Sequence, residues 1–518
     1  MKALAKRIGL ALDDRLNAVM VKELRQAVRA RFIVGILLLF LAGQLAVVGI
    51  AILGSSDLGA DLQPGSGVFS MLYGVLAFAC LVCVPAYCGM RMDGERSETN
   101  IDLMFTTTLK PRAIVWGKLL SGMILAAFFA SVCVPFMTFT YLLRGIDLPT
   151  ISILLLFGAG VTAAAVQGAL FLAALPLGRA FKGLLKVGGG LMLIWATVMV
   201  LDISDDLIRS GVGSRMGDGE FWVGFGCAAA ALLLPAWVVF EVCAATLAPP
   251  AANRAFGPRL AITVGWLASG VVVLVAERWL PYSNYWRIWT TCHFLLLSLA
   301  LLVGVSEREE FGPRILRRAP RHFILRQLAY LFTSGSAPAV LWTTLLALGT
   351  FAVEALWSKA KGSHAYFEEF VYPLGTFWLY SYCYSLTALL LWRWTFKRWF
   401  PKRATGAIAV ILCAAVIVVP FVFFAIFDSV KLDHLGRGDL SLIGNPLMVF
   451  SEKHLQVHFM FAGFWAALVT LLNLPAFLAQ WRTFKRPEAG DQGTEAGGQR
   501  PKVGSRRPEV GNGINGIP

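Results

Sequence analysis

The sequence predicts an all-α, polytopic integral membrane protein with about twelve transmembrane helices and an amphipathic N-terminal interfacial helix. Two observations support this fold class. First, 57% of the 518 residues are hydrophobic and 15% are charged, whereas soluble domains carry about 25% charged residues. Second, the apolar residues are gathered into long runs, and a helical span needs about 20 consecutive apolar residues to satisfy its backbone inside the bilayer.

The chain begins with a segment, residues 1–31, that has the pattern of an amphipathic helix rather than a cleavable signal peptide, because it lacks a short apolar core. Leu16, Met20, Leu24 and Val28 recur every four residues, while basic and polar residues occupy the other face. Such a helix lies in the membrane interface. We therefore expect it to precede the first span on the surface of the bilayer.

Apolar runs then define the predicted spans in order, and each run is long enough, or nearly so, to cross a bilayer. They are residues 32–54, 67–89, 117–143, 150–176, 183–201, 221–247, 259–275, 288–305, 337–357, 372–392, 404–427 and 457–480.

A charged, proline-interrupted segment, residues 306–336, separates two groups of spans, and residues 321–331 within it have the composition of a second amphipathic helix. The expected organisation is an interfacial helix (1–31), a six-span transmembrane domain (32–247), two further spans with a basic connector (248–336), a four-span bundle (337–481) and a disordered tail (482–518). The tail is assigned from its richness in Gly, Pro and charge.

Basic residues fix the expected orientation, because Lys and Arg near span ends favour the cytoplasmic side. Basic connections alternate with poorly basic ones along the chain, so both termini are predicted to be cytoplasmic, in a bacterial-type cytoplasmic (inner) membrane. The net charge of +15 follows from this arrangement beside anionic lipid. It does not indicate nucleic-acid binding, because no basic stripe interleaved with aromatic residues lies outside the span flanks.

One polar connection has a distinctive order of residues between the second and third spans. It consists of Glu95-Arg96-Ser97-Glu98-Thr99-Asn100-Ile101-Asp102-Leu103-Met104, then Thr106-Thr107-Thr108-Leu109-Lys110-Pro111, then Ile114-Val115-Trp116-Gly117-Lys118. This segment resembles the cytoplasmic coupling loop of the type-2 ABC transporter permease family. The residues that match the family pattern are Glu95, Arg96, Ile101, Asp102, Leu103, Thr107, Leu109, Ile114, Gly117 and Lys118. Thr99-Asn100 stands where the family usually has Gly-Thr, and Thr108 where it usually has Pro.

The resemblance implies the transmembrane permease subunit of an ATP-driven exporter, which couples hydrolysis by a separate cytoplasmic ATPase to substrate movement. It implies a coupling surface made of Glu95, Arg96, Ile101, Asp102, Met104, Phe105, Thr107 and Lys118. The N-terminal helix would add Lys22, Glu23, Leu24 and Arg25. From the residue types, the apolar members would seat in a groove of the partner, the charged members would orient it, and Lys118 would extend its ammonium to the membrane surface.

This chain contains no phosphate-cradling P-loop, since Gly117-Lys118 lacks the upstream glycine of that motif. We therefore expect a non-catalytic transport subunit with no cofactor of its own, ATP and Mg being bound by the partner ATPase. No catalytic or metal-ligating set is evident. Cys80-x-x-Cys83 lies inside a span and suits packing, His454 and His458 lack a third ligand, and Glu354 has Lys359 as a nearby ion-pair candidate.

Two alternative functions stay open at this stage. An ion-gradient-driven secondary transporter would also have twelve spans with inner termini, but it would need charges near the membrane midplane. A membrane anchor or scaffold would hold an ATPase without translocating cargo. Whether one chain supplies both halves of a pathway, forms a homodimer or pairs with a second permease is also open.

Overall fold

The computed structural model of the chain describes residues 17–54, 64–95, 110–142, 146–176, 178–249, 251–280, 284–362, 367–429, 444–450 and 455–485. Within these ranges the ordered elements are all helical and none is a strand. Twelve helices are long and apolar enough to cross a membrane. The predicted all-α, twelve-span fold class is confirmed.

The first half of the chain forms an N-terminal helix followed by six spans. Their bounds are α2 (Ala18–Arg29), α3 (Arg31–Gly54), α4 (Pro64–Phe78) with the π-helical turn η1 (Ala79–Cys83) and α5 (Val84–Glu95), α7 (Pro111–Leu142), α8 (Leu148–Ala174), α9 (Arg179–Ser210), the short α10 (Val212–Arg215) and α11 (Gly219–Leu247). The elements α4, η1 and α5 together make one span.

The second half contains six further spans, with short α- and 3-10 helices between them. Its elements are α12 (Phe256–Trp279), α13 (Tyr285–Val305), α14 (Pro313–Arg317), α15 (Phe323–Leu331), α16 (Ser336–Lys361), η2 (Phe367–Val371) with α18 (Tyr372–Trp394), η3 (Phe396–Arg398), η4 (Lys402–Ala404), α19 (Thr405–Ser429), η6 (Met448–Phe450) and α20 (Leu455–Thr483). The amphipathic helix expected at 321–331 is present as α15.

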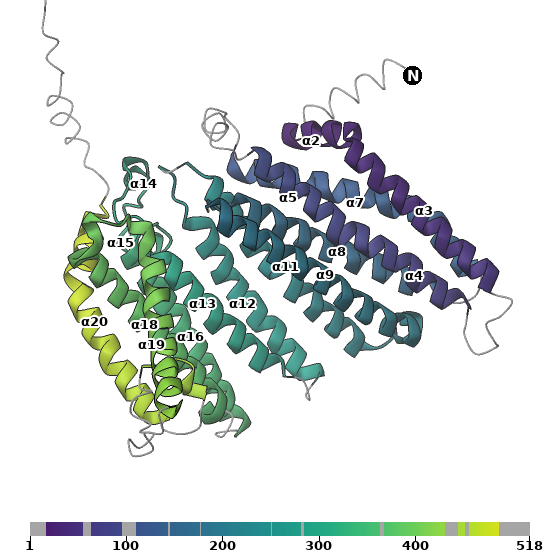
Figure 1. Ribbon diagram of the computed structural model, residues 1–518. Coiled ribbons are helices and arrows are strands. Elements are labelled where there is room, and N and C mark those ends of the chain that lie inside the picture. Colours follow the sequence, from purple (N-terminus) through teal and green to yellow (C-terminus); the bar gives the residue numbers. More distant parts are fainter. Residues whose placement is uncertain are drawn as a thin grey trace, which may run out of the picture.

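Two separate hydrophobic cores divide the helices into two groups, which meet where α11 packs against α12. One core contains buried residues from Ala27 to Leu247, and the other contains buried residues from Ile262 to Val469. Figure 1 shows the helices running side by side from α3 at one edge to α20 at the other. The helix α2 lies across one end of this layer, and α14 and α15 lie at the same end, which we call the α2 side.

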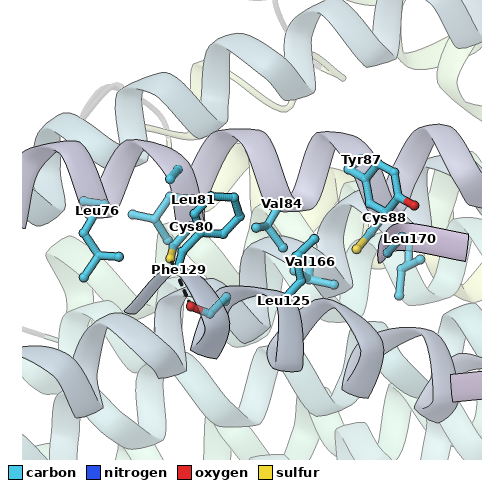
Figure 2. Packing of buried hydrophobic residues seen from close by; sticks show 14 of the residues in the cluster. Leu76, Cys80, Leu81, Val84, Tyr87, Cys88, Leu125, Phe129, Val166 and Leu170 are labelled. Atoms are coloured by element: carbon cyan, nitrogen blue, oxygen red, sulfur yellow. Dashed lines mark hydrogen bonds between the residues drawn. The ribbon is translucent and has the colours of Figure 1, made fainter. Parts of the chain in front are cut away.

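A π-helical turn interrupts the second span just before Pro85. The N–H of Val84 donates to the carbonyl of Ala79, which gives the wider turn, and the following proline has no N–H to continue the ladder. Cys80 in this turn donates through Sγ to the carbonyl of Ala126 in α7 at 3.8 Å (Figure 2). All nine cysteines are free, so Cys80 and Cys83 serve packing as expected and form no disulfide.

Span boundaries differ most from the sequence expectation where helices extend beyond their apolar runs. The fifth span was expected at 183–201 but runs as α9 to Ser210, and the second was expected to end at residue 89 but continues to Glu95. The additional turns carry charged residues, including Asp93, which an apolar criterion excludes. Polar ends of these helices therefore project past the hydrophobic stretch.

Candidate functional site

The N-terminal helix α2 is fixed against the start of α7 by its first residue. The side chain of Asn17 accepts a hydrogen bond from the N–H of Val19 at 3.0 Å, which caps the helix. The Nδ2 of the same side chain donates to the carbonyl of Ala113 in α7 at 2.5 Å. One residue therefore both begins α2 and attaches it to the third span.

Gly117 in α7 permits this contact because it has no side chain. A Cβ placed there would lie 2.9 Å from both Asn17 Nδ2 and Val19 Cβ, closer than real Cβ contacts. The glycine of the Gly117-Lys118 pair thus has a steric reason in this structure. It lets α2 cross directly over the backbone of α7.

Beneath that crossing, Lys118 and Glu23 form a buried ion pair that joins α7 to α2. Lys118 Nζ lies 2.6 Å from Glu23 Oε1 and 2.7 Å from an oxygen of Glu95, the last residue of α5. The side chains of Lys118 and Glu23 are 4% and 6% exposed, and Glu95 is 28% exposed. Because a charge removed from water needs close opposite charges, this arrangement ties three helices together at the α2 side.

Further basic residues complete the charge balance around this ion pair. Lys22 Nζ lies 2.7 Å from Glu95, and Arg91 Nε lies 3.7 Å from Glu23. On the other side of α5, Asp93 pairs with Lys182 and Lys186 near the start of α9. The end of α5 is therefore bound to α2, α7 and α9 immediately before residue 96. We call Lys22, Glu23, Arg91, Glu95 and Lys118 the α2–α7 network.

The chain re-enters the described structure at Lys110, and its next turn is attached to α11. Arg112 donates through Nε and Nη2 to the Oε2 of Glu241 at 3.0 and 2.7 Å. Glu241 lies in α11 and its side chain is 9% exposed. Here it holds the start of α7, so both ends of segment 96–109 are fixed by ion pairs to neighbouring helices.

This geometry gives the segment between Glu95 and Lys110 a rigid base. A force applied to the segment would reach α5 and α7 first, and through the ion pairs would reach α2, α9 and α11. Helices transmit such displacements because packed interiors deform little. The ion pairs at the two ends of this segment therefore link it to α2, α9 and α11 as well as to α5 and α7.

The predicted site residues fall into three groups. Arg96, Ile101, Asp102, Met104, Phe105 and Thr107 lie outside the described residues. Lys22 and Arg25 are exposed on α2, and Leu24 and Glu95 are half-buried. Lys118 and Glu23 are buried, so Lys118 does not extend to the membrane surface as expected, because Glu23 and Glu95 hold its ammonium inside. Asn17, Arg91 and Glu241 were not predicted, since charged or polar residues at span ends have no distinguishing sequence pattern.

The second half has its own ion pairs at the α2 side. Glu309 accepts from Arg393 Nη2 at 2.6 Å and from Lys402 Nζ at 2.5 Å, joining the connector to α18 and the start of α19. Burial alone would raise the pKa of Glu309, but Lys402 and Arg393 outweigh it and hold that pKa at about 2. Glu309 is therefore ionised at neutral pH and stabilises this end of the second half.

A carboxyl group also lies inside the second half, near the opposite side. Glu354 in α16 is fully buried, one of its oxygens accepts from Thr290 Oγ1 of α13, and the other has no hydrogen-bond partner. The suggested partner Lys359 is wrong, since Lys359 is exposed and makes no ion pair with Glu354. Aromatic rings of Trp286, Trp289 and Trp357 pack together in the neighbouring turns.

Metal-binding groups of three or more His, Cys, Asp or Glu side chains are absent from the described part of the chain. His458 instead shares a hydrogen bond with the hydroxyl of Tyr380 at 2.9 Å. Comparisons with protein-family models, curated proteins and solved structures found no match.

Proposed function

We propose that this twelve-span protein is the transmembrane permease subunit of an ATP-driven exporter, powered by a separate cytoplasmic ATPase. The observation that carries the proposal is the α2–α7 network, in which Lys118 joins Glu23 to Glu95, the residue immediately before the segment that resembles a coupling loop. An ordinary solvated loop has no need of a buried ion pair across three helices. A loop that transmits force needs both ends held firmly.

In this proposal the partner ATPase contacts residues 96–109 and the exposed face of α2. Lys22 and Arg25 lie on that face, while Lys118 and Glu23 act as positioning residues below it. Movement of the ATPase on binding and hydrolysing ATP would displace α5 and α7 together. The π-helical turn before Pro85 offers a place where the second span can bend.

Co-purification tests the proposal with a charge reversal inside the loop. The tagged chain is purified in mild detergent from native membranes, as wild type and as Arg96→Glu plus Asp102→Lys, and P-loop ATPases are quantified by mass spectrometry with ATP turnover. The matched control is Arg215→Glu plus Asp218→Lys, which reverses one exposed cation and one exposed anion between the end of α9 remote from Asp93 and the start of α11. All three carry the same net charge.

We expect an ATPase to accompany the wild type and the control and to be lost from the loop variant. If the loop variant still recovered most of the ATPase that the wild type recovers, these charges would have no role in docking. Absence of a nucleotide-binding protein from all three samples, in several detergents, would refute the ATP-driven assignment.

Ion-gradient transport is the second candidate, and Glu354 is the specific observation that favours it. Intramembrane ionisable side chains are rare and commonly mark ion or substrate pathways, and the free oxygen of Glu354 is available to a cation or proton. In proteoliposomes with an imposed pH gradient, a wild-type proton-coupled carrier would dissipate the gradient. Glu354→Gln would abolish this dissipation, whereas the control Glu369→Gln, on the exposed η2 turn, would not. A gradient unaffected by the wild type would exclude this candidate.

A further inference from the structure

A large pocket lies on the α2 side where the two groups of helices meet. It has a volume of about 1070 Å³ and is lined by the end of α11, the start of α12, helices α14 and α15, and the first turn of α7. This volume is at the upper end of the range of small-molecule sites, roughly 300–1,000 Å³. The pocket therefore has room for a ligand of substantial size.

The charges that line the pocket are nearly all positive. They comprise the five basic residues Lys110, Arg112, Arg254, Arg314 and Arg318 and a single carboxylate, Glu241, which is already paired with Arg112. Among the described residues, Lys110, Arg314 and Arg318 have no carboxylate within ion-pair distance. An anion entering the pocket would therefore meet cations that no acidic side chain in this part of the structure neutralises.

The remaining lining is largely apolar and continues onto an exposed apolar surface. Ala248, Leu260 and Phe332 contribute to the wall, and Leu325 and Leu328 of α15 line the pocket while each remaining 55% exposed. Phe323 and Ile324 of the same helix are exposed as well. A soluble anion gains nothing from such a wall, whereas an amphiphile places its head against the cations and its chains against the apolar side chains.

We propose that this pocket binds the headgroup of an anionic phospholipid, with Arg314 and Arg318 contacting the phosphate and α15 contacting the acyl chains. The pocket lies at the ends of membrane-spanning helices, the depth at which lipid headgroups lie, and basic pockets between such helices bind anionic headgroups. A lipid in this position would contact both halves of the protein. The inference is independent of the proposed coupling to an ATPase.

Native mass spectrometry of the delipidated full chain in detergent tests the site, with dioctanoyl phosphatidylglycerol as the probe and dioctanoyl phosphatidylcholine as the neutral comparison. The variant is Arg314→Gln plus Arg318→Gln. Its matched control is Arg317→Gln plus Arg321→Gln, which removes two exposed charges from the same segment but not from the pocket lining. Because all four arginines are exposed, we expect unchanged thermal unfolding.

We expect phosphatidylglycerol to bind the wild type and the control equally, and the pocket variant roughly tenfold or more weakly, since each surface cation contributes measurably to anionic-lipid affinity. Equal binding of phosphatidylcholine, or equal losses in both variants, would overturn the proposal. Full competition by glycerol phosphate would assign the pocket to a soluble anion, and full competition by a tetraglutamate peptide would assign it to an acidic protein segment. Either result would also overturn it.

Discussion

Replacing Lys118 by Met tests whether the α2–α7 network holds the N-terminal helix in place. Methionine keeps most of the side-chain volume and removes the charge, so Glu23 loses its partner at 2.6 Å. Breaking a buried ion pair by removing one member costs about 3–5 kcal/mol. Arg91 remains 3.7 Å from Glu23, and Lys22 remains 2.7 Å from Glu95, so we expect the lower end, about 3 kcal/mol.

This cost should appear as release of α2 rather than as global unfolding. Since every 1.4 kcal/mol is a factor of ten, the open population of α2 should rise on the order of 100-fold. Trypsin cleavage after Arg25 and Arg29 measures that population when opening is fast compared with cleavage. Lys186→Met is the matched control, because Lys186 pairs with Asp93 at an exposed position and such pairs contribute little.

A second variant tests whether the unpaired carboxylate of Glu23 is what releases α2. Glu23→Gln combined with Lys118→Met removes both members of the buried pair, and only the partly exposed Arg91 then loses an ion-pair partner, at 3.7 Å. The double variant should therefore release α2 less than Lys118→Met alone. If trypsin cleaved Lys118→Met at the rate of the wild type or of Lys186→Met, the α2–α7 network would contribute no more than a surface ion pair and would not hold α2 in place.

Three further changes give separate expectations. Gly117→Ala should increase trypsin cleavage in α2, because the added Cβ would lie 2.9 Å from Val19 Cβ. The control Gly168→Ala places its Cβ in open space and should leave the cleavage rate unchanged. Equal cleavage rates in the two variants would contradict the close crossing of α2 and α7. Arg259→Lys should lower the thermal unfolding midpoint, because a lysine cannot reproduce the guanidinium's hydrogen bonds to two backbone carbonyls and the carboxylate of Glu307. An unchanged midpoint would show that these hydrogen bonds do not stabilise the protein. Glu309→Gln should destabilise the protein at pH 7, and the loss of stability should shrink as the pH falls from about 4.5 towards 2. The pKa of Glu309 is lowered in the folded state, so its ion pairs stabilise the fold only while the carboxylate is ionised. A loss of stability that did not change with pH would contradict this.

The spans were predictable because a membrane-spanning helix needs a long, continuous run of apolar residues, which is visible in the sequence. An N-terminal helix was predictable from the four-residue spacing of Met20, Leu24 and Val28, and a helix is present at Ala18–Arg29. Its buried residues are Met20, Glu23 and Ala27, whereas Val28 is exposed, so the buried face differs from the predicted apolar stripe. Helix ends were less predictable, since the turns carrying Asp93 and Glu95 are polar and no apolar criterion includes them. The wide turn at Ala79–Cys83 has only the following Pro85 as a sequence signal.

The candidate site was only partly predictable for a different physical reason. The sequence marks Gly117 and Lys118 as a pair, but whether a lysine at a span end reaches water or turns inward depends on which carboxylates fold against it. Glu23 lies 95 residues away in the chain, and no local pattern joins it to Lys118. The pairing of Arg112 with Glu241, across 129 residues, is equally invisible before the helices are packed.

Site-specific photocrosslinking tests whether residues 96–109 contact an ATPase, as we propose. A photoreactive amino acid replaces Asp102, and the control carries the same substitution at exposed Ser214 in α10, which follows the end of α9 remote from Asp93. After illumination of intact cells, we expect position 102, and not position 214, to form an adduct with a P-loop ATPase. Adducts at position 102 that contain only lipid or unrelated membrane proteins would contradict it.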